Sequence, residues 1–254
     1  MRFAMTIAGS DSSAGAGMQQ DLKTCTALGV YCATVITSIT AQNTFEVTAI
    51  HDVPAEIVEA QIEAVLADLE IEHAKTGMLS NSDIVRSVAK EVREHSLKVI
   101  VDPVMVAKSG AVLLKQEAIS SLKESLLSEA YFVTPNVPEA EILSGIKISN
   151  VKDMMEAAKE IKSLGPKYVV VKGGHLQGEF VTDVFYDGSS FKKFTYRRIN
   201  TKNTHGGGDT LSAALTSYLS IGYEPLKAYS LARRFMQRAI EKNLSIGKGY
   251  GPAN

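Results

Sequence analysis

The chain has 254 residues, with 27 Lys and Arg against 28 Asp and Glu, a formal net charge of -1 and an apolar fraction of 45%. A charge so close to zero argues against a protein that binds nucleic acid through bulk electrostatics. No apolar run approaches the roughly 18 residues of a membrane span, and the N-terminus lacks a signal-peptide pattern. With Cys25 and Cys32 interpreted as reduced core thiols, we expect a cytoplasmic protein.

Strand and helix patterns alternate along the chain. Short apolar, β-branched runs predict strands at 3–8, 30–39, 97–101, 131–134 and 168–171. Periodic apolar positions predict helices at about 18–28, 55–69, 80–93, 115–127, 138–143, 151–164, 209–220 and 225–243. Ser80 or Ser82 is the expected cap of the third helix. Asp187-Gly188, between two strand-like arms, predicts a hairpin over 184–194.

The strand pattern also indicates the fold class. Runs without polar alternation are typical of parallel strands covered on both faces. We therefore expect a single α/β domain over residues 1–254, with a mostly parallel central sheet between two helical layers. Ligands of such folds bind at the carboxyl ends of the strands, so the polar residues placed there are the candidate site.

A glycine-bearing loop follows the first strand and opens a helix. Residues 9–23 read GSDSSAGAGMQQDLK, which is neither a P-loop nor a dinucleotide fingerprint and so argues against a nicotinamide dehydrogenase. Asp21 lies in the first turns of that helix, where it either favours the helix dipole or accepts hydrogen bonds from a polar ligand. Gln42, after the second strand, is a solvated amide or a reader of a heterocycle edge.

Three further strand ends carry polar side chains. Asp102 ends an apolar strand, where it caps a loop or serves magnesium or substrate. Asn136 and Glu139 span a strand end and a helix start, and oxygen donors there suit magnesium as well as the helix dipole. Lys172 follows another strand and is a phosphate partner or a surface lysine.

The clearest signal is NTKNTHGGGDTLSAAL, residues 200–215. Gly206, Gly207 and Gly208 run directly into a helix, so that their amides and the helix N-terminus predict an anion site. Asp209 stands on the first turn beside that anion. It is an acid that stabilises the helix start, or a general base next to a phosphate cradle.

Together these motifs resemble a known family. AGSDSSAGAG with DLKT, AQNT, KTGML, DPVM, TPNVPEAE, KGGH, NTKNTHGGG and GKGYGP occur in this order from Thr6 to Pro252. They closely resemble the hydroxymethylpyrimidine/phosphomethylpyrimidine kinases of thiamine biosynthesis. That family belongs to the ribokinase-like superfamily, which also contains the pyridoxal kinases.

The resemblance implies ATP-dependent phosphorylation of 4-amino-5-hydroxymethyl-2-methylpyrimidine and then of its monophosphate, with ATP and Mg²⁺ as cofactors. It implies that the pyrimidine is held by Gly9, Asp21, Gln42, Met78 and Val104. It implies that ATP and its magnesium are handled by Asn136, Glu139, Lys172, Thr204 and Lys248. Glu139 and Asp102, the latter from its place at a strand end, are the metal candidates. Relatives are often dimers, so a homodimer is expected.

One departure from the family pattern concerns the catalytic position. The family usually reads HGTGCT where this chain reads HGGGDT, so Asp209 replaces a Cys. Asp at this place is the ribokinase pattern, and a carboxylate accepts a hydroxyl proton without prior deprotonation. A fixed anion would also repel a phosphorylated acceptor, which puts the second step in question. The alternatives are a pyridoxal or pyridoxine kinase and a non-catalytic vitamin-precursor binder.

Overall fold

One sheet of nine strands organises the protein. The computed structural model describes residues 1–107 and 109–253. The strands are β1 (Arg2–Asp11), β2 (Val30–Gln42), β3 (Val47–Asp52), β4 (His73–Thr76), β5 (Lys98–Val101), β6 (Ala130–Val133), β7 (Tyr168–Val171), β8 (Phe180–Tyr186) and β9 (Phe191–Arg197). Their order in the sheet is β3-β2-β1-β4-β5-β6-β7-β8-β9.

The centre of this sheet is parallel and its two edges are antiparallel. β2, β1, β4, β5, β6 and β7 run in one direction. β3 folds back on β2, and the β8–β9 hairpin folds back on β7. The carboxyl ends of the six parallel strands therefore meet at one edge, which confirms the predicted mostly parallel sheet.

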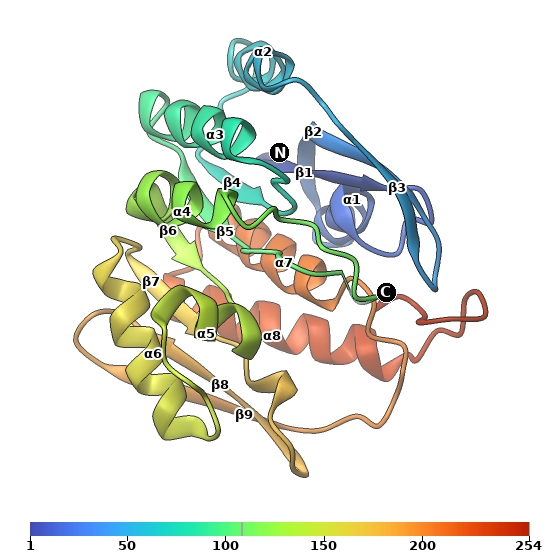
Figure 1. Ribbon diagram of the computed structural model, residues 1–254, viewed down its shortest axis with the longest axis vertical. Coiled ribbons are helices and arrows are strands. Elements are labelled where there is room, and N and C mark those ends of the chain that lie inside the picture. The colour runs from blue at the N-terminus through green and yellow to red at the C-terminus, as the bar shows by residue number, and fades with distance from the viewer. Residues whose placement is uncertain (108, 254) are drawn as a thin grey trace.

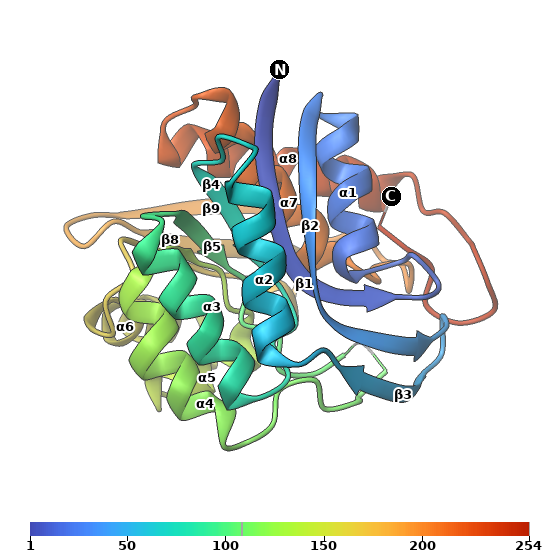
Figure 2. The same ribbon diagram turned by 90° about the horizontal axis from the view of Figure 1, so that it is seen from above.

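Two helical layers cover the sheet (Figures 1 and 2). One layer holds α1 (Gly17–Ala27), α7 (Gly207–Ile221) and α8 (Pro225–Glu241). The other holds α2 (Ala55–Leu66), α3 (Ser82–Glu94), α4 (Ala118–Ser121), α5 (Val137–Ser144) and α6 (Val151–Ser163). Each layer packs on its own apolar core, with Leu211 and Tyr229 against Phe132 on one side and Ile62, Val88 and Ile161 in the core of the other.

The structure differs from the sequence-based elements at three places. β3 and β4 were not predicted, β3 because it is largely exposed and β4 because three of its four residues are polar. The helix expected over 115–127 is instead α4 followed by a π-helical turn (Leu122–Leu126) and a 3₁₀ turn (Leu127–Glu129). Among the described residues, no helix has the length and apolar character to cross a membrane.

The cap of α3 is also corrected. Asn81, rather than Ser80 or Ser82, is the N-cap, and its side chain accepts hydrogen bonds from the amides of Asp83 and Ile84. We expect Asn81→Ala to lower the free energy of unfolding by about 1 kcal/mol, because two amides at the helix start lose their acceptor. Urea denaturation measures this loss. Ser82→Ala is the control, and an equal loss in both variants would contradict the assignment.

Candidate active site

A cavity of about 850 Å³ opens at the carboxyl ends of the parallel strands. Most of the predicted site residues line it. These are Gly9, Gln42, Met78, Asp102, Val104, Asn136, Glu139, Lys172, Thr204, Gly206, Gly207, Gly208 and Asp209. Residues far apart in the chain are thus brought to one wall because the parallel strands end at the same edge of the sheet. Asp21 and Lys248 are not part of that wall.

The glycine segment forms the start of α7 at the cavity. Gly206 is the N-cap and has a φ of +70°, a left-handed conformation that favours glycine. A Cβ there would lie 2.1 Å from the carbonyl oxygen of Gly15, so the loop after β1 packs directly on the α7 start. Exposed amides at a helix N-terminus attract anions, and the predicted anion site is therefore geometrically available.

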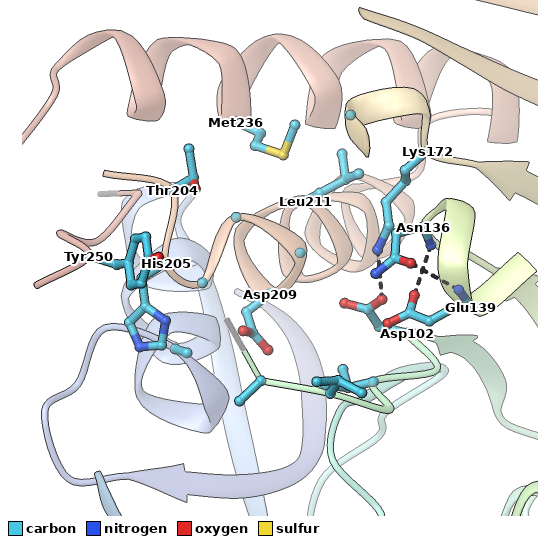
Figure 3. A pocket seen from close by; sticks show the side chains of 18 of the residues that line it. Asp102, Asn136, Glu139, Lys172, Thr204, His205, Asp209, Leu211, Met236 and Tyr250 are labelled. Atoms are coloured by element: carbon cyan, nitrogen blue, oxygen red, sulfur yellow. Dashed lines mark hydrogen bonds and ion pairs between the residues drawn. The ribbon is translucent and has the colours of Figure 1, made fainter. Parts of the chain in front are cut away.

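Asp209 lies on the first turn of α7, with its side chain 14% exposed at the cavity. One of its oxygens, Oδ1, accepts a hydrogen bond from Lys75 Nζ at 2.9 Å. Figure 3 shows Asp209 between two groups of side chains, with His205 and Tyr250 to one side and Lys172, Asn136 and Asp102 to the other. A carboxylate at this place can contact molecules bound on both sides.

Asp21 is placed differently from its expected role. Its side chain is fully buried beneath Lys75, accepts hydrogen bonds from Lys75 Nζ at 2.8 Å to both oxygens, and accepts a third from Thr6 Oγ1 at 2.6 Å. The direct contact with a pyrimidine that the resemblance implied is therefore corrected to a contact with Lys75. No sequence pattern predicted this pairing, because Lys75 lies in the polar strand β4, which was itself not predicted.

Lys172 and Asp102 form a second ion pair, at the cavity wall. Lys172 Nζ lies 2.9 Å from Asp102 Oδ1, and the lysine side chain is 16% exposed. Burial lowers the pKa of Lys172, but the charges of Asp102 and Glu139 outweigh it, so the pKa lies above its usual value. The lysine is a cation held at the cavity wall, with a geometry that suits an incoming anion.

Asn136 and Glu139 cap α5. The Asn136 side chain accepts from the Glu139 amide at 3.0 Å, and the Glu139 side chain accepts from the Asn136 amide at 2.8 Å. Burial raises the pKa of Glu139 to about 7, against the attraction of Lys172. The role at the helix start is confirmed by this capping box. Both residues also line the cavity, and their magnesium role stays a prediction.

Sequence reasoning assigned no role to a third pair, Asp11 and His205. Asp11 Oδ2 lies 3.1 Å from His205 Nε2, and Gln42 Nε2 lies 3.3 Å from the same ring atom. Burial raises the pKa of Asp11, but hydrogen bonds from His205 and Ser13 outweigh it and hold the pKa below its usual value. Asp11 and His205 each stand in one of the two glycine motifs, and that position was the available sign that they belong to the site.

The C-terminal segment contributes Tyr250 to the cavity wall, and not the expected Lys248. Lys248, the predicted phosphate contact, is exposed on the loop after α8 and lies outside the cavity wall. Tyr250, two residues further on, lines the cavity, as do Arg198, Met236 and Ile240. Tyr250 stands in the GKGYGP motif, which was the available signal for it, whereas no motif marks Arg198, Met236 or Ile240.

No group of three or more His, Cys, Asp and Glu side chains that could hold a metal ion occurs in residues 1–107 and 109–253. Among the carboxylates of the cavity wall, Asp102 and Glu139 both act electrostatically on Lys172 and raise its pKa. Mg²⁺ commonly takes one or two carboxylates and completes its shell with water and substrate phosphates. The donors present fit that pattern.

This arrangement defines a class. The sheet has its candidate ligand residues at its carboxyl edge. The start of α7 is the candidate anion site, with Asp209 on its first turn and Lys172 close to Gly208. These are the features of small-molecule kinases with the ribokinase-like fold.

The comparisons narrow the class to a family. The family model described as phosphomethylpyrimidine kinase matches residues 11–254. A Bacillus subtilis hydroxymethylpyrimidine/phosphomethylpyrimidine kinase is 46% identical over 99% of this chain and 93% of its own. The chain belongs to the phosphomethylpyrimidine kinase family, which confirms the resemblance found in the motifs.

Solved structures of related kinases agree with this family assignment. A phosphomethylpyrimidine kinase from Clostridium difficile matches with a TM-score of 0.84 and 45% identity, over 94% of this chain and 100% of that one. An ADP complex of Bacillus subtilis pyridoxal kinase matches with a TM-score of 0.92 and 39% identity, over 99% and 96% of the two chains. The predicted ribokinase-like fold and kinase class are confirmed.

Proposed function

We propose that this protein uses ATP to phosphorylate the hydroxymethyl group of the thiamine pyrimidine precursor and then phosphorylates the monophosphate. One observation carries the proposal most directly. Asp209 places a carboxylate at the cavity on the first turn of a helix whose N-terminus can bind an anion, with the cation Lys172 also in the wall. Relatives 46% identical over the full chain are named for both substrates.

The residues present supply the parts of an in-line phosphoryl transfer. The acceptor hydroxyl lies against Asp209, which takes its proton as the oxygen attacks the γ-phosphorus. The bond from phosphorus to the β,γ-bridging oxygen breaks, and ADP leaves with that electron pair. Lys172 and the amides of Gly206 and Gly208 stabilise the charge on the transferring group. The Gly207 amide, also predicted for this role, instead donates to the carbonyl oxygen of Thr204 at 3.2 Å.

Asp102 and Glu139 are the proposed magnesium ligands. Bound there, Mg²⁺ would neutralise charge on the β- and γ-phosphates. Asp102 is also paired with Lys172 at 2.9 Å, so the same carboxylate orients the lysine toward the phosphates. Gly9, Gln42, Met78 and Val104 remain the proposed pyrimidine wall, and Asn136 belongs to the nucleotide side. Thr204, also a predicted ATP contact, lies on the His205 side of Asp209 (Figure 3).

A substrate panel with ATP and magnesium tests this function. We expect turnover of the pyrimidine alcohol, followed by turnover of its monophosphate, measured as ADP release and product mass. Titration calorimetry run alongside separates an enzyme from a non-catalytic binder. Binding of the pyrimidine alcohol without ADP release would contradict the proposal and favour the binder.

Pyridoxal kinase activity is the second candidate. The specific observation is the TM-score of 0.92 to Bacillus subtilis pyridoxal kinase, higher than the 0.84 to the Clostridium difficile phosphomethylpyrimidine kinase. The two activities share the transfer chemistry and differ in the ring that the Gln42 side of the cavity holds. A kcat/KM for pyridoxine above that for the pyrimidine alcohol would favour this candidate.

Lys172→Met tests the nucleotide side. We expect the Kd for ATP to rise about 10- to 100-fold, because a charged hydrogen bond to phosphate is lost and Asp102 loses its partner. The Kd for the pyrimidine alcohol should change little, since the lysine lies on the other side of Asp209. Calorimetry with each ligand measures both. Equal weakening for the two ligands would contradict the assignment.

We further propose a homodimer in the cytoplasm, with residues 1–254 as one kinase domain. The exposed apolar side chains Ile39, Phe45 and Ile50 gather around the β2–β3 edge and favour a contact there. The free thiols of Cys25 and Cys32 support a reducing compartment. Light scattering after size exclusion tests the dimer, and a monomer mass at micromolar concentration would contradict it.

A further inference from the structure

A buried cluster of three charged side chains lies under the catalytic end of α7. Lys75 comes from β4, Asp21 from α1 and Asp209 from α7. The Lys75 side chain is 1% exposed and that of Asp21 is 0% exposed, whereas Asp209 is 14% exposed and reaches the cavity. Asp209 is thus the member of the cluster that both contacts the buried lysine and lines the cavity, where phosphoryl transfer is proposed.

Lys75 makes three close contacts in this cluster. An ammonium group has three N–H donors and no acceptor. Nζ lies 2.8 Å from each oxygen of Asp21 and 2.9 Å from Oδ1 of Asp209. Thr6 Oγ1 donates to Asp21 at 2.6 Å and so anchors the far end of the cluster.

The lysine is held as a cation. Burial alone lowers the pKa of Lys75, but the charges of Asp209, Asp21 and Asp102 outweigh burial, and the pKa lies above its usual value. Gly77 makes room for this group, because a Cβ at that position would lie 3.1 Å from Nζ and 3.0 Å from the Ala8 Cβ. Packing therefore leaves the ammonium little freedom to move.

Such a cluster is expensive to bury. Removing charges from water costs several kcal/mol for each ion, and apolar residues of similar volume often stabilise a core at least as well. Here the fixed cation binds Oδ1 of Asp209, and the Asp209 side chain lines the cavity. An orienting role explains the cost, because a general base must be within hydrogen-bond reach of its proton in a fixed direction.

We propose that Lys75 is a positioning residue for phosphoryl transfer, which holds the Asp209 carboxylate through Oδ1 and is itself anchored by Asp21 and Thr6. The inference rests on the proposed kinase function. It gives Asp21 a role in the reaction through Lys75 instead of through contact with the pyrimidine. The cation also offsets part of the charge of Asp209, which eases the approach of a phosphorylated acceptor.

Three variants test the proposal against wild type. Asp21→Asn keeps Lys75 and its contact with Asp209. The Lys75→Met/Asp21→Asn double variant removes the lysine without leaving Asp21 charged and alone. The triple variant adds Asp209→Asn. Lys90→Met is the matched control, because Lys90 also pairs with two carboxylates, Glu59 at 3.3 Å and the buried Glu91 at 3.2 Å, but does not line the cavity. Circular dichroism and thermal melting confirm folding for each.

We expect the double variant to lose about 10- to 100-fold in kcat, with the KM values for ATP and the pyrimidine alcohol within about twofold. Asp21→Asn should lose about tenfold or less, since the Lys75–Asp209 contact remains. The triple variant should be no slower than Asp209→Asn alone, because a positioning residue has nothing left to position. Lys90→Met should match wild type.

Several results would overturn the proposal. One is a folded double variant with wild-type kcat, and another is a rise in KM at constant kcat. A third is full additivity of the Lys75 and Asp209 losses. If the Lys75→Met/Asp21→Asn double variant does not fold, Lys75→Gln with Asp21→Asn keeps polar packing without the charge, and the same loss in kcat is expected. An inactive wild type would contradict the kinase function itself, whereas an active wild type with an unaffected double variant contradicts Lys75 alone.

Discussion

Asp209→Asn should lower kcat about 10²- to 10⁴-fold, the range of general base catalysis. The amide keeps the size and shape of the carboxylate but cannot take the hydroxyl proton as the oxygen attacks. KM for ATP should change less than about threefold, because the nucleotide side of the cavity is built from other residues. Steady-state kinetics with coupled detection of ADP measures both quantities.

The control for this variant is Asp187→Asn. Asp187 accepts hydrogen bonds from the Ser189 and Ser190 amides in the β8–β9 turn, and the Asn oxygen can accept the same bonds. Its kcat should equal that of wild type. A kcat of Asp209→Asn within about threefold of wild type, with folding intact, would remove the carboxylate from its assigned role.

The sequence predicts those parallel strands that are continuous apolar runs, the pattern of strands buried on both faces. β5, β6 and β7 are short apolar runs between helical segments, and Tyr168–Val171 has the predicted bounds. Their carboxyl ends carry Asp102, Asn136 and Lys172, which the fold brings together. The site could be predicted to that extent, because the edge of the sheet is fixed by the strand direction.

β4 was not predicted because its buried residues are mostly polar, and one of them, Lys75, contacts Asp209. It is buried throughout, yet His73, Lys75 and Thr76 make it polar, so that it lacks the apolar run of its neighbours. Local rules fail where a sequence serves chemistry as well as packing. The contact between Lys75 and Asp21 could not be predicted either. A carboxylate in the first turns of α1 is equally consistent with dipole stabilisation, a ligand contact or a buried ion pair.

The glycine motif could be assigned to an anion site from sequence, but the roles of its members differ in a way only the structure shows. Gly206 is in the left-handed region and would direct a Cβ into the loop after β1. Gly207 has open space within 4 Å of its Cβ position. Backbone geometry therefore requires glycine at position 206 of this run, but it does not require glycine at position 207.

Gly206→Ala should for this reason lower kcat about 10²-fold or more. A Cβ would lie 2.1 Å from the Gly15 carbonyl oxygen, so that the start of α7 must shift and its amides no longer point at the transferring phosphoryl group. The backbone cost at a positive φ adds to the effect. Gly207→Ala is the matched comparison, with an expected loss of about tenfold or less. Equal kcat losses in the two variants, measured by ADP release on folded protein, would show that the conformation of Gly206 does not control the anion site.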